Sequence, residues 1–212
     1  MKDSTALDQL ILRYPSLAVC RDDIFDAALA LCATFCHYNK LLICGNGGSW
    51  ADAHHIAGEL LKSFTRKRPI TEEWADALPD EIRGKLEGGL PAIVLGSAGA
   101  FASAFANDVD PDLIYAQEAQ VMGGVGDTLF CISTSGNAKN VVLAAQVAKA
   151  KGLAVIGLTG RDGGCLKPLC DICICVPEDE TYRIQELHLP VYHTLCILVE
   201  NAMFARTVSN GE

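Results

Sequence analysis

His55 and Glu59 are the first residues in the chain whose types and spacing could perform acid–base chemistry. In a helix, four residues turn the chain by about 400°, which places both side chains on one face, one turn apart. Such a pair could bind one metal ion or share a substrate, and it is also a common surface contact between neighbouring turns. The apolar neighbours Ile56, Ala57 and Leu60 predict a partly buried helix, where an unpaired carboxylate costs more free energy.

A second pair, Gln185 and His193, lies in the last helical pattern of the chain. Eight residues separate two positions by about 12 Å along a helix axis and about 80° around it. One metal ion between these side chains would therefore stretch both of them. Pro190 lies between them and is expected to distort the helix.

Two loops are rich in small polar residues: GNGGS at 45–49 and STSGN at 133–137. Each follows a short apolar run and precedes a helical pattern. Glycines let backbone N–H groups approach an anion, hydroxyls donate hydrogen bonds, and the dipole of the following helix favours negative charge. One such loop is compatible with ordinary turn and N-cap chemistry, but two on strands of one sheet favour an anion site. Neither loop contains the lysine of a Walker motif.

Short apolar runs alternate with helical patterns along the chain, which predicts an α/β fold with a parallel sheet and helices on both faces. The expected strands are 41–44, 92–95, 128–132, 153–158 and 172–176, and the expected helices are 22–38, 50–64, 137–150 and about 182–206. We expect a single domain over 1–212, with an N-terminal helical segment within 1–38. The charged segment 66–89 is expected to be a solvated surface insertion with one or two short helices, or alternatively a lid or subunit contact.

Composition excludes several classes of protein. The 212 residues are 50% hydrophobic and 20% charged, which excludes a disordered chain. A net charge of −9 argues against broad contact with nucleic acid or an anionic membrane. The uncharged segment 88–106 contains enough glycine and proline to favour a strand, a turn and a buried helix over a membrane span, and the N-terminus lacks the pattern of a secretory signal. The ten cysteines lie mostly in apolar periodic segments, which favours reduced, packed thiols and a cytoplasmic location over a metal site.

The chain resembles the sugar isomerase (SIS) domain, and within it the phosphoheptose isomerases, in a series of motifs that occur in the same order. These are GNGGS with Asp52 and His55 on the next helix, ISTSGN, LTGRDGG at 158–164, and RIQELH at 183–188 followed by His193. The resemblance covers roughly 40–65 and 90–205. It implies a flavodoxin-like SIS domain, a homotetramer with sites between subunits, and an aldose–ketose isomerase. The implied reaction converts sedoheptulose 7-phosphate to D-glycero-D-manno-heptose 7-phosphate through an enediol.

The resemblance also implies roles for individual residues. Those expected to bind the sugar phosphate are Asn46, Gly47, Gly48, Ser49, Asn107, Asp108, Ser133, Thr134, Ser135 and Gln185. Those expected to bind one zinc ion per site are His55, Glu59, Gln185 and His193. A kink near Pro190, or a ligand from another subunit, would relieve the long spacing between Gln185 and His193. A glutamine carbonyl is also a weak zinc ligand. Without metal, the histidine and glutamate side chains could still transfer protons.

The implied reaction moves a proton between C1 and C2 of an open-chain sugar, so it needs a base beside these carbons and a polarising group at the oxygens. Glu59 is the candidate for one proton transfer and His193 for the other. Zinc, if bound, would stabilise the enediolate.

Two residues depart from the family pattern. Tyr182 stands where these isomerases commonly have aspartate, and Ala138 where they often have serine, so an isomerase of another phosphosugar remains an alternative. A second alternative is a non-catalytic SIS module that binds sugar phosphate or associates with DnaA. The joint presence of His55, Glu59, Gln185 and His193 favours the enzyme.

Overall fold

The five expected strands form one parallel sheet in the computed structural model, which describes residues 5–70 and 73–204. The strands are β1 (Leu41–Gly45), β2 (Ala92–Val94), β3 (Thr128–Ser133), β4 (Ala154–Thr159) and β5 (Ile172–Cys175). Their order is β2-β1-β3-β4-β5, and every neighbouring pair is parallel. This is the flavodoxin-like order, in which the direction of winding reverses between β1 and β3 and ligands bind beyond the carboxyl ends of these strands. The predicted fold class is confirmed.

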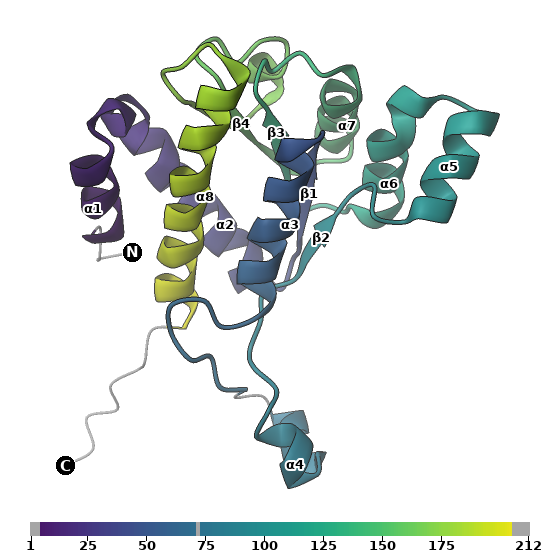
Figure 1. Cartoon of the computed structure of the whole chain (residues 1–212). Coiled ribbons are helices and arrows are strands. Elements are labelled where there is room, and N and C mark those ends of the chain that lie inside the picture. Colours follow the sequence, from purple (N-terminus) through teal and green to yellow (C-terminus); the bar gives the residue numbers. More distant parts are fainter. Residues whose placement is uncertain (1–4, 71–72, 205–212) are drawn as a thin grey trace.

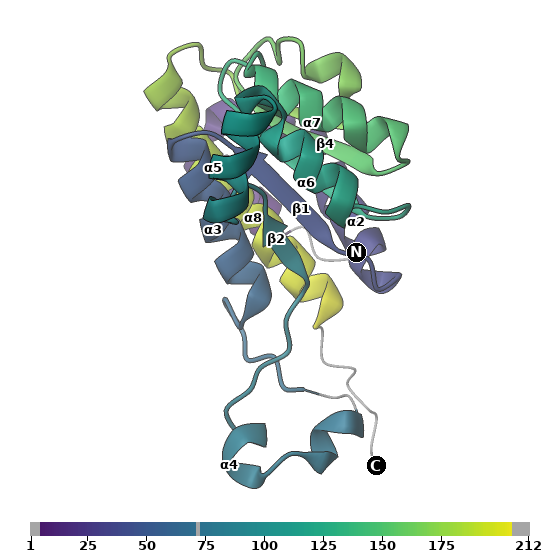
Figure 2. The same cartoon turned by 90° about the vertical axis from the view of Figure 1, so that its right-hand side faces the viewer.

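Helices cover both faces of the sheet because alternate strand residues point to opposite sides. In β1, Leu41 and Ile43 belong to one apolar core and Leu42 and Cys44 to the other. The first core is covered by α1 (Thr5–Arg13), α2 (Arg21–Cys36), α3 (Gly48–Leu61) and α8 (Thr181–Met203). The second is covered by α6 (Ile114–Met122) and α7 (Lys139–Ala150). α8 lies between α1 and α3, and α6 and α7 lie on the other side of the sheet (Figures 1 and 2).

The helix boundaries differ from the predicted ones in several places. The predicted helix at 50–64 begins two residues earlier and ends at Leu61, and the one at 137–150 begins at Lys139. The last predicted helix ends at Met203, and positions 205 and 206 lie outside the described residues. α8 runs unbroken through Pro190, where the Thr194 hydroxyl donates to the Pro190 carbonyl at 2.8 Å.

The helix expected within 88–106 forms, as α5 (Gly99–Asp108), but the prediction that it is buried is wrong. No residue of α5 is buried, because the helix lies outside the sheet and packs mainly against α6 and the short helix Pro111–Leu113 (Figure 1). Phe101 and Phe105 are half-buried and contact each other with ring centroids 5.3 Å apart.

The charged insertion contains the short helices Glu73–Ala77 and α4 (Asp80–Arg83), as predicted. It extends away from the sheet below α3 and α8 (Figures 1 and 2). Its root is not solvated, however: the Arg68 side chain is buried and forms an ion pair with Glu200 of α8.

Two further expectations concern the whole chain. None of the helices in the described residues is long and apolar enough to cross a bilayer. All ten cysteines are free thiols, and all except Cys36 and Cys165 are buried or half-buried.

Candidate active site

The two glycine-rich loops lie next to each other, after the neighbouring strands β1 and β3. The amides of Asn46 and Asn140 link them: Asn46 Nδ2 donates to Asn140 Oδ1 at 2.8 Å, and Asn140 Nδ2 donates to Asn46 Oδ1 at 2.9 Å. The Tyr115 hydroxyl donates to the Gly45 carbonyl at 2.5 Å and fixes the first loop from below. The structure therefore joins both predicted loops into one site. Asn140 and Tyr115 were missed, because only their contacts across the fold reveal a role.

The second loop is tightly folded and leaves one hydroxyl at the surface. Gly136 has a φ of 64°, and a Cβ on it would lie 2.0 Å from the Gly163 carbonyl oxygen, so only glycine fits. Ser133 is buried and Thr134 half-buried, whereas Ser135 is exposed. The Ser135 hydroxyl accepts a hydrogen bond from the Asn137 N–H at 3.1 Å.

The first loop ends in the N-terminus of α3, and Gln185 reaches it from the first turns of α8. A Cβ on Gly48 would lie 2.7 Å from Gln185 Nε2, so this amide packs directly against the loop backbone. Gly47 has a φ of 55°, and Ser49 is buried behind it. The structure thus places Gln185 with the other residues expected to bind the phosphate. Gly48, which Gln185 contacts, lies about two helical turns before His55 on α3.

Glu59 and His193 meet at His55, which lies between them. His55 Nε2 is 3.3 Å from Glu59 Oε1 and 3.4 Å from His193 Nε2. The two imidazole rings form an edge contact with centroids 4.8 Å apart. Glu59 Oε2 is buried without a hydrogen-bond partner, and Lys62 Nζ lies 3.6 Å from it. The predicted convergence of a carboxylate and an imidazole from separate helices is therefore present within one chain.

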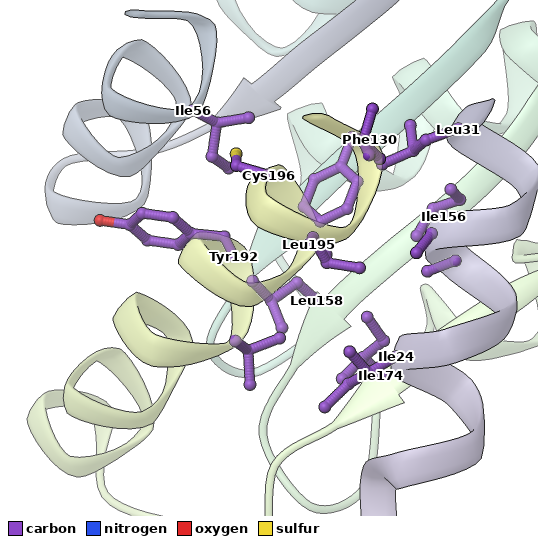
Figure 3. Packing of buried hydrophobic residues seen from close by; sticks show 14 of the residues in the cluster. Ile24, Leu31, Ile56, Phe130, Ile156, Leu158, Ile174, Tyr192, Leu195 and Cys196 are labelled. Carbon is purple, nitrogen blue, oxygen red and sulfur yellow. The ribbon is translucent and has the colours of Figure 1, made fainter. Parts of the chain in front are cut away.

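His55 is oriented by two residues that sequence reasoning missed, Asp52 and Tyr192. The Tyr192 hydroxyl donates to Asp52 Oδ1 at 3.2 Å and lies 3.0 Å from His55 Nδ1. Since its only hydrogen goes to Asp52, the Tyr192 oxygen must accept from His55 Nδ1–H, which fixes the orientation of the imidazole ring and directs Nε2 at Glu59 and His193. Figure 3 shows the Tyr192 hydroxyl pointing away from the apolar core around Phe130 and Leu195. The spacing of Asp52 and His55, three residues apart on α3, was the signal available in the sequence.

Burial sets the protonation states around this group. Desolvation, together with the neighbouring His55, lowers the pKa of His193, which keeps its imidazole neutral near pH 7 and able to accept a proton. Desolvation raises the pKa of Asp52, and the hydrogen bond from Tyr192 opposes this shift. Desolvation and the nearby Asp52 carboxylate raise the pKa of Tyr192, so its hydroxyl stays protonated and remains a donor.

His55 lies at a distance from Glu59 and from His193 that two ligands of one zinc ion would have, taken one pair at a time. Two tetrahedral ligands, each about 2.0–2.1 Å from zinc, lie about 3.4 Å from each other. The His55–His193 and His55–Glu59 separations of 3.4 and 3.3 Å match this value, and the orphaned Glu59 Oε2 is a further donor. Gln185 is directed at Gly48 instead, and across residues 5–70 and 73–204 no three His, Cys, Asp or Glu side chains already converge as a metal cage.

Two of the expected substrate-binding residues form no hydrogen bond with the loops or with His55 in the described part of the chain. Asn107 and Asp108 end α5, where both are exposed and Asn107 Nδ2 donates to Asp108 Oδ1 at 2.8 Å. Tyr182 is exposed, and its hydroxyl accepts a hydrogen bond from Arg183 Nε at 3.0 Å. Ala138 precedes α7 and supplies no side-chain cap.

The sheet is wound in the order of a sugar isomerase (SIS) domain. It carries two loops of small polar residues at the point where the winding reverses, and a group of carboxylate and imidazole side chains on α3 and α8. The family model described as the SIS domain matches residues 103–198. The phosphoheptose isomerase of Trichlorobacter lovleyi is 38% identical over 204 residues, covering 96% of this chain and 94% of the relative. That of Aneurinibacillus thermoaerophilus is 41% identical, covering 78% and 74%. The solved phosphoheptose isomerase of Neisseria gonorrhoeae superposes with a TM-score of 0.74 at 29% identity, covering 92% of this chain and 94% of that one. The chain belongs to the phosphoheptose isomerase family.

Proposed function

We propose that the protein is an aldose–ketose isomerase that converts sedoheptulose 7-phosphate to D-glycero-D-manno-heptose 7-phosphate through an enediol. The observation that carries this proposal is the meeting of Glu59 and His193 at His55, beside two phosphate-type loops. The relatives that match nearly the whole chain are named phosphoheptose isomerases, and this supports the same reaction.

The geometry suggests how the substrate lies. Its phosphate binds at the loops, where Ser133, Thr134 and Ser135, the glycine backbone and the N-terminal ends of α3 and α7 offer donors and positive potential. His55 lies seven residues after Gly48 on α3, or about 10 Å along the axis. An open-chain heptose lying along α3 therefore brings C1 and C2 to Glu59 and His193 when its phosphate is at the loops.

Proton transfer is assigned to the side chains at the far end of this path. One of Glu59 and His193 removes the proton from C1 of the ketose, and the other delivers a proton to C2, with the enediol between the two steps. A neutral His193 suits the removal of the C1 proton, because its lowered pKa leaves a lone pair available near pH 7, and the imidazolium formed in that step would then be able to donate a proton. Asp52 and Tyr192 hold His55 in one orientation, so that its Nε2 stays directed at the other two side chains.

A zinc ion is proposed for His55, Glu59, His193 and Gln185. When bound, it supplies a Lewis acid that stabilises negative charge on the enediolate oxygens. The donor distances at His55 support the first three ligands, whereas Gln185 must turn away from Gly48 to become the fourth.

The enzyme is further proposed to be a cytoplasmic homotetramer with active sites between subunits. The helix α5 supports this assembly because it carries two phenylalanines and has no buried residue within one chain. A neighbouring subunit would also bring Asn107 and Asp108, which end this helix, to a site that they do not reach within their own chain. Light scattering at micromolar concentration should give four times the mass of the chain, and a monomer would refute the assembly.

The direct test is incubation with sedoheptulose 7-phosphate, before and after chelation and with zinc restored, while aldose product is followed. We expect product from the native enzyme, less after chelation and recovery with zinc. A panel of other ketose phosphates tests whether Tyr182 has changed the preferred sugar. Tight binding of sugar phosphates with no turnover of any of them would support the non-catalytic alternative instead.

A further inference from the structure

Arg68 lies at the root of the charged insertion, yet its side chain is only 1% exposed. The guanidinium donates three hydrogen bonds: Nε to Glu200 Oε1 at 2.6 Å, Nη1 to the Leu60 carbonyl at 2.7 Å and Nη2 to the Glu59 carbonyl at 2.9 Å. A guanidinium that is buried this deeply and donates three hydrogen bonds holds the elements that it contacts in fixed relative positions.

The two carbonyls belong to the last turn of α3, which ends at Leu61. The last four carbonyls of a helix have no partner inside it, and positive charge is favourable at that end. Arg68 therefore closes the turn from which the Glu59 side chain departs. Without this cap, the Glu59 carbonyl loses its Arg68 partner and the Leu60 carbonyl keeps the Leu90 N–H at 2.9 Å, so the final turn of α3 is held less firmly and the Glu59 carboxylate gains freedom to move.

Glu200 anchors the same guanidinium to α8. Its carboxylate is fully buried and also accepts hydrogen bonds from the N–H groups of Phe64 at 2.9 Å and Thr65 at 2.8 Å. Glu200 lies seven residues, or about two turns, after His193 on the same helix. The side chain of Phe64, whose backbone N–H donates to this carboxylate, has its ring centroid 5.7 Å from that of His193.

We infer that Arg68 is a positioning residue for the isomerisation. By binding the end of α3 and Glu200 of α8 at once, it sets the distance between the Glu59 carboxylate and the His193 imidazole. It acts through these elements and does not itself reach the substrate, because it lies buried behind them. The inference rests on the catalytic roles proposed above for Glu59 and His193.

Arg68→Met and Arg68→Lys test this inference. Methionine removes all three hydrogen bonds, whereas lysine keeps one charge for Glu200 but cannot reproduce the planar fork. Calorimetric titration with reduced, unreactive heptitol 7-phosphate gives the fraction of binding-competent sites, and initial rates then give kcat for each competent site. We expect kcat per competent site to fall at least about tenfold in Arg68→Met and less in Arg68→Lys, because small displacements of reacting groups are costly. The affinity for heptitol phosphate should change by less than about threefold, because the phosphate loops lie at the other end of α3.

Lys67→Met is the matched control, since Lys67 is the preceding residue and its ion pair with Glu87 is exposed. It should leave kcat and affinity unchanged. A purely structural role for Arg68 would lower the competent fraction and the melting temperature but keep kcat per competent site within about twofold of the native value, and that result would overturn the inference. If Arg68→Met does not fold, Arg68→Lys decides by the same criterion. Full turnover in Glu59→Gln would instead refute the proposed catalytic roles, so the two failures are distinguishable.

Discussion

The two ends of the proposed substrate path are built differently. At the phosphate end, short loops at the ends of neighbouring strands supply the contacts, and their shape depends on backbone conformation, as at Gly136. At the reaction end, three supporting contacts join side chains far apart in sequence: His55 with His193, His55 with Tyr192, and Arg68 with Glu200. The phosphate end thus depends on backbone conformation and the reaction end on helix packing, and substitutions should affect them differently.

The largest loss of stability is expected from Gly136→Ala at the phosphate end. The added methyl group would collide with the backbone of Gly163, and φ is 64°, so we expect a loss of roughly 3 kcal/mol or more in unfolding free energy. Gly47→Ala is the comparison variant, because its φ of 55° is similar but no atom lies within 4 Å of an added Cβ. It should cost less, roughly 1–3 kcal/mol from backbone strain alone, because φ 55° with ψ −118° is a conformation that alanine rarely adopts. Urea denaturation measures both, and equal losses would show that crowding by Gly163 is unimportant.

Acid should weaken the protein through His188, which lies on α8 between the two ends. The side chain is fully buried, and neither ring nitrogen has a hydrogen-bond partner of standard geometry in the described structure. Burial lowers the pKa of His188 to about 4, against a smaller opposing effect of the Thr159 backbone. The unfolded chain takes up this proton below about pH 6.5, so the stability contribution is complete above pH 6.5 and is lost as the pH falls toward 4.

The expected loss from His188 is about 3 kcal/mol of unfolding free energy, from a difference of about 2.5 pKa units. Denaturant unfolding from pH 7 to 4 should show a shallower decline in His188→Leu than in the native protein. The exposed His54→Gln should leave the decline unchanged. Parallel curves for the native protein and His188→Leu would contradict the assignment.

Tyr192→Phe separates orientation from proton transfer at the reaction end. It removes the hydroxyl between Asp52 and His55 but keeps the ring packed in the core. Loss of such a supporting contact typically costs about 10- to 100-fold in activity or metal affinity. We expect kcat to fall within this range with little change in sugar phosphate affinity. A normal kcat would mean that His55 needs no support from Tyr192.

The smallest effect is expected at the tip of the insertion. Arg83 forms ion pairs with Asp76 and Asp80 at exposed positions, and such pairs contribute little. Arg83→Ala should change the unfolding free energy by less than about 0.5 kcal/mol and leave turnover unchanged. A marked fall in kcat would show that the tip of the insertion acts as a lid and contributes to the reaction end of the site.

This contrast also explains how much the sequence could predict. The strands and both loops were predictable because apolar runs, glycines and hydroxyl residues are local signals. The partners of Arg68 and Tyr192 were not, since a side chain and its partner more than 100 residues away share no local pattern. A buried helix was expected within the uncharged segment 88–106, yet burial of α5 depends on what packs against it. Gln185 was expected among the zinc ligands, and only the packing of α8 on α3 shows it at Gly48.

The most direct measurement is turnover of sedoheptulose 7-phosphate by Glu59→Gln and by His193→Gln, with binding of the same sugar phosphate checked in parallel. Both substitutions keep the approximate size of the side chain while removing its proton-transfer group. We predict that each variant binds the sugar phosphate at its intact loops and forms no measurable aldose product. Substantial product from either variant would contradict the assignment of the two proton transfers to these residues.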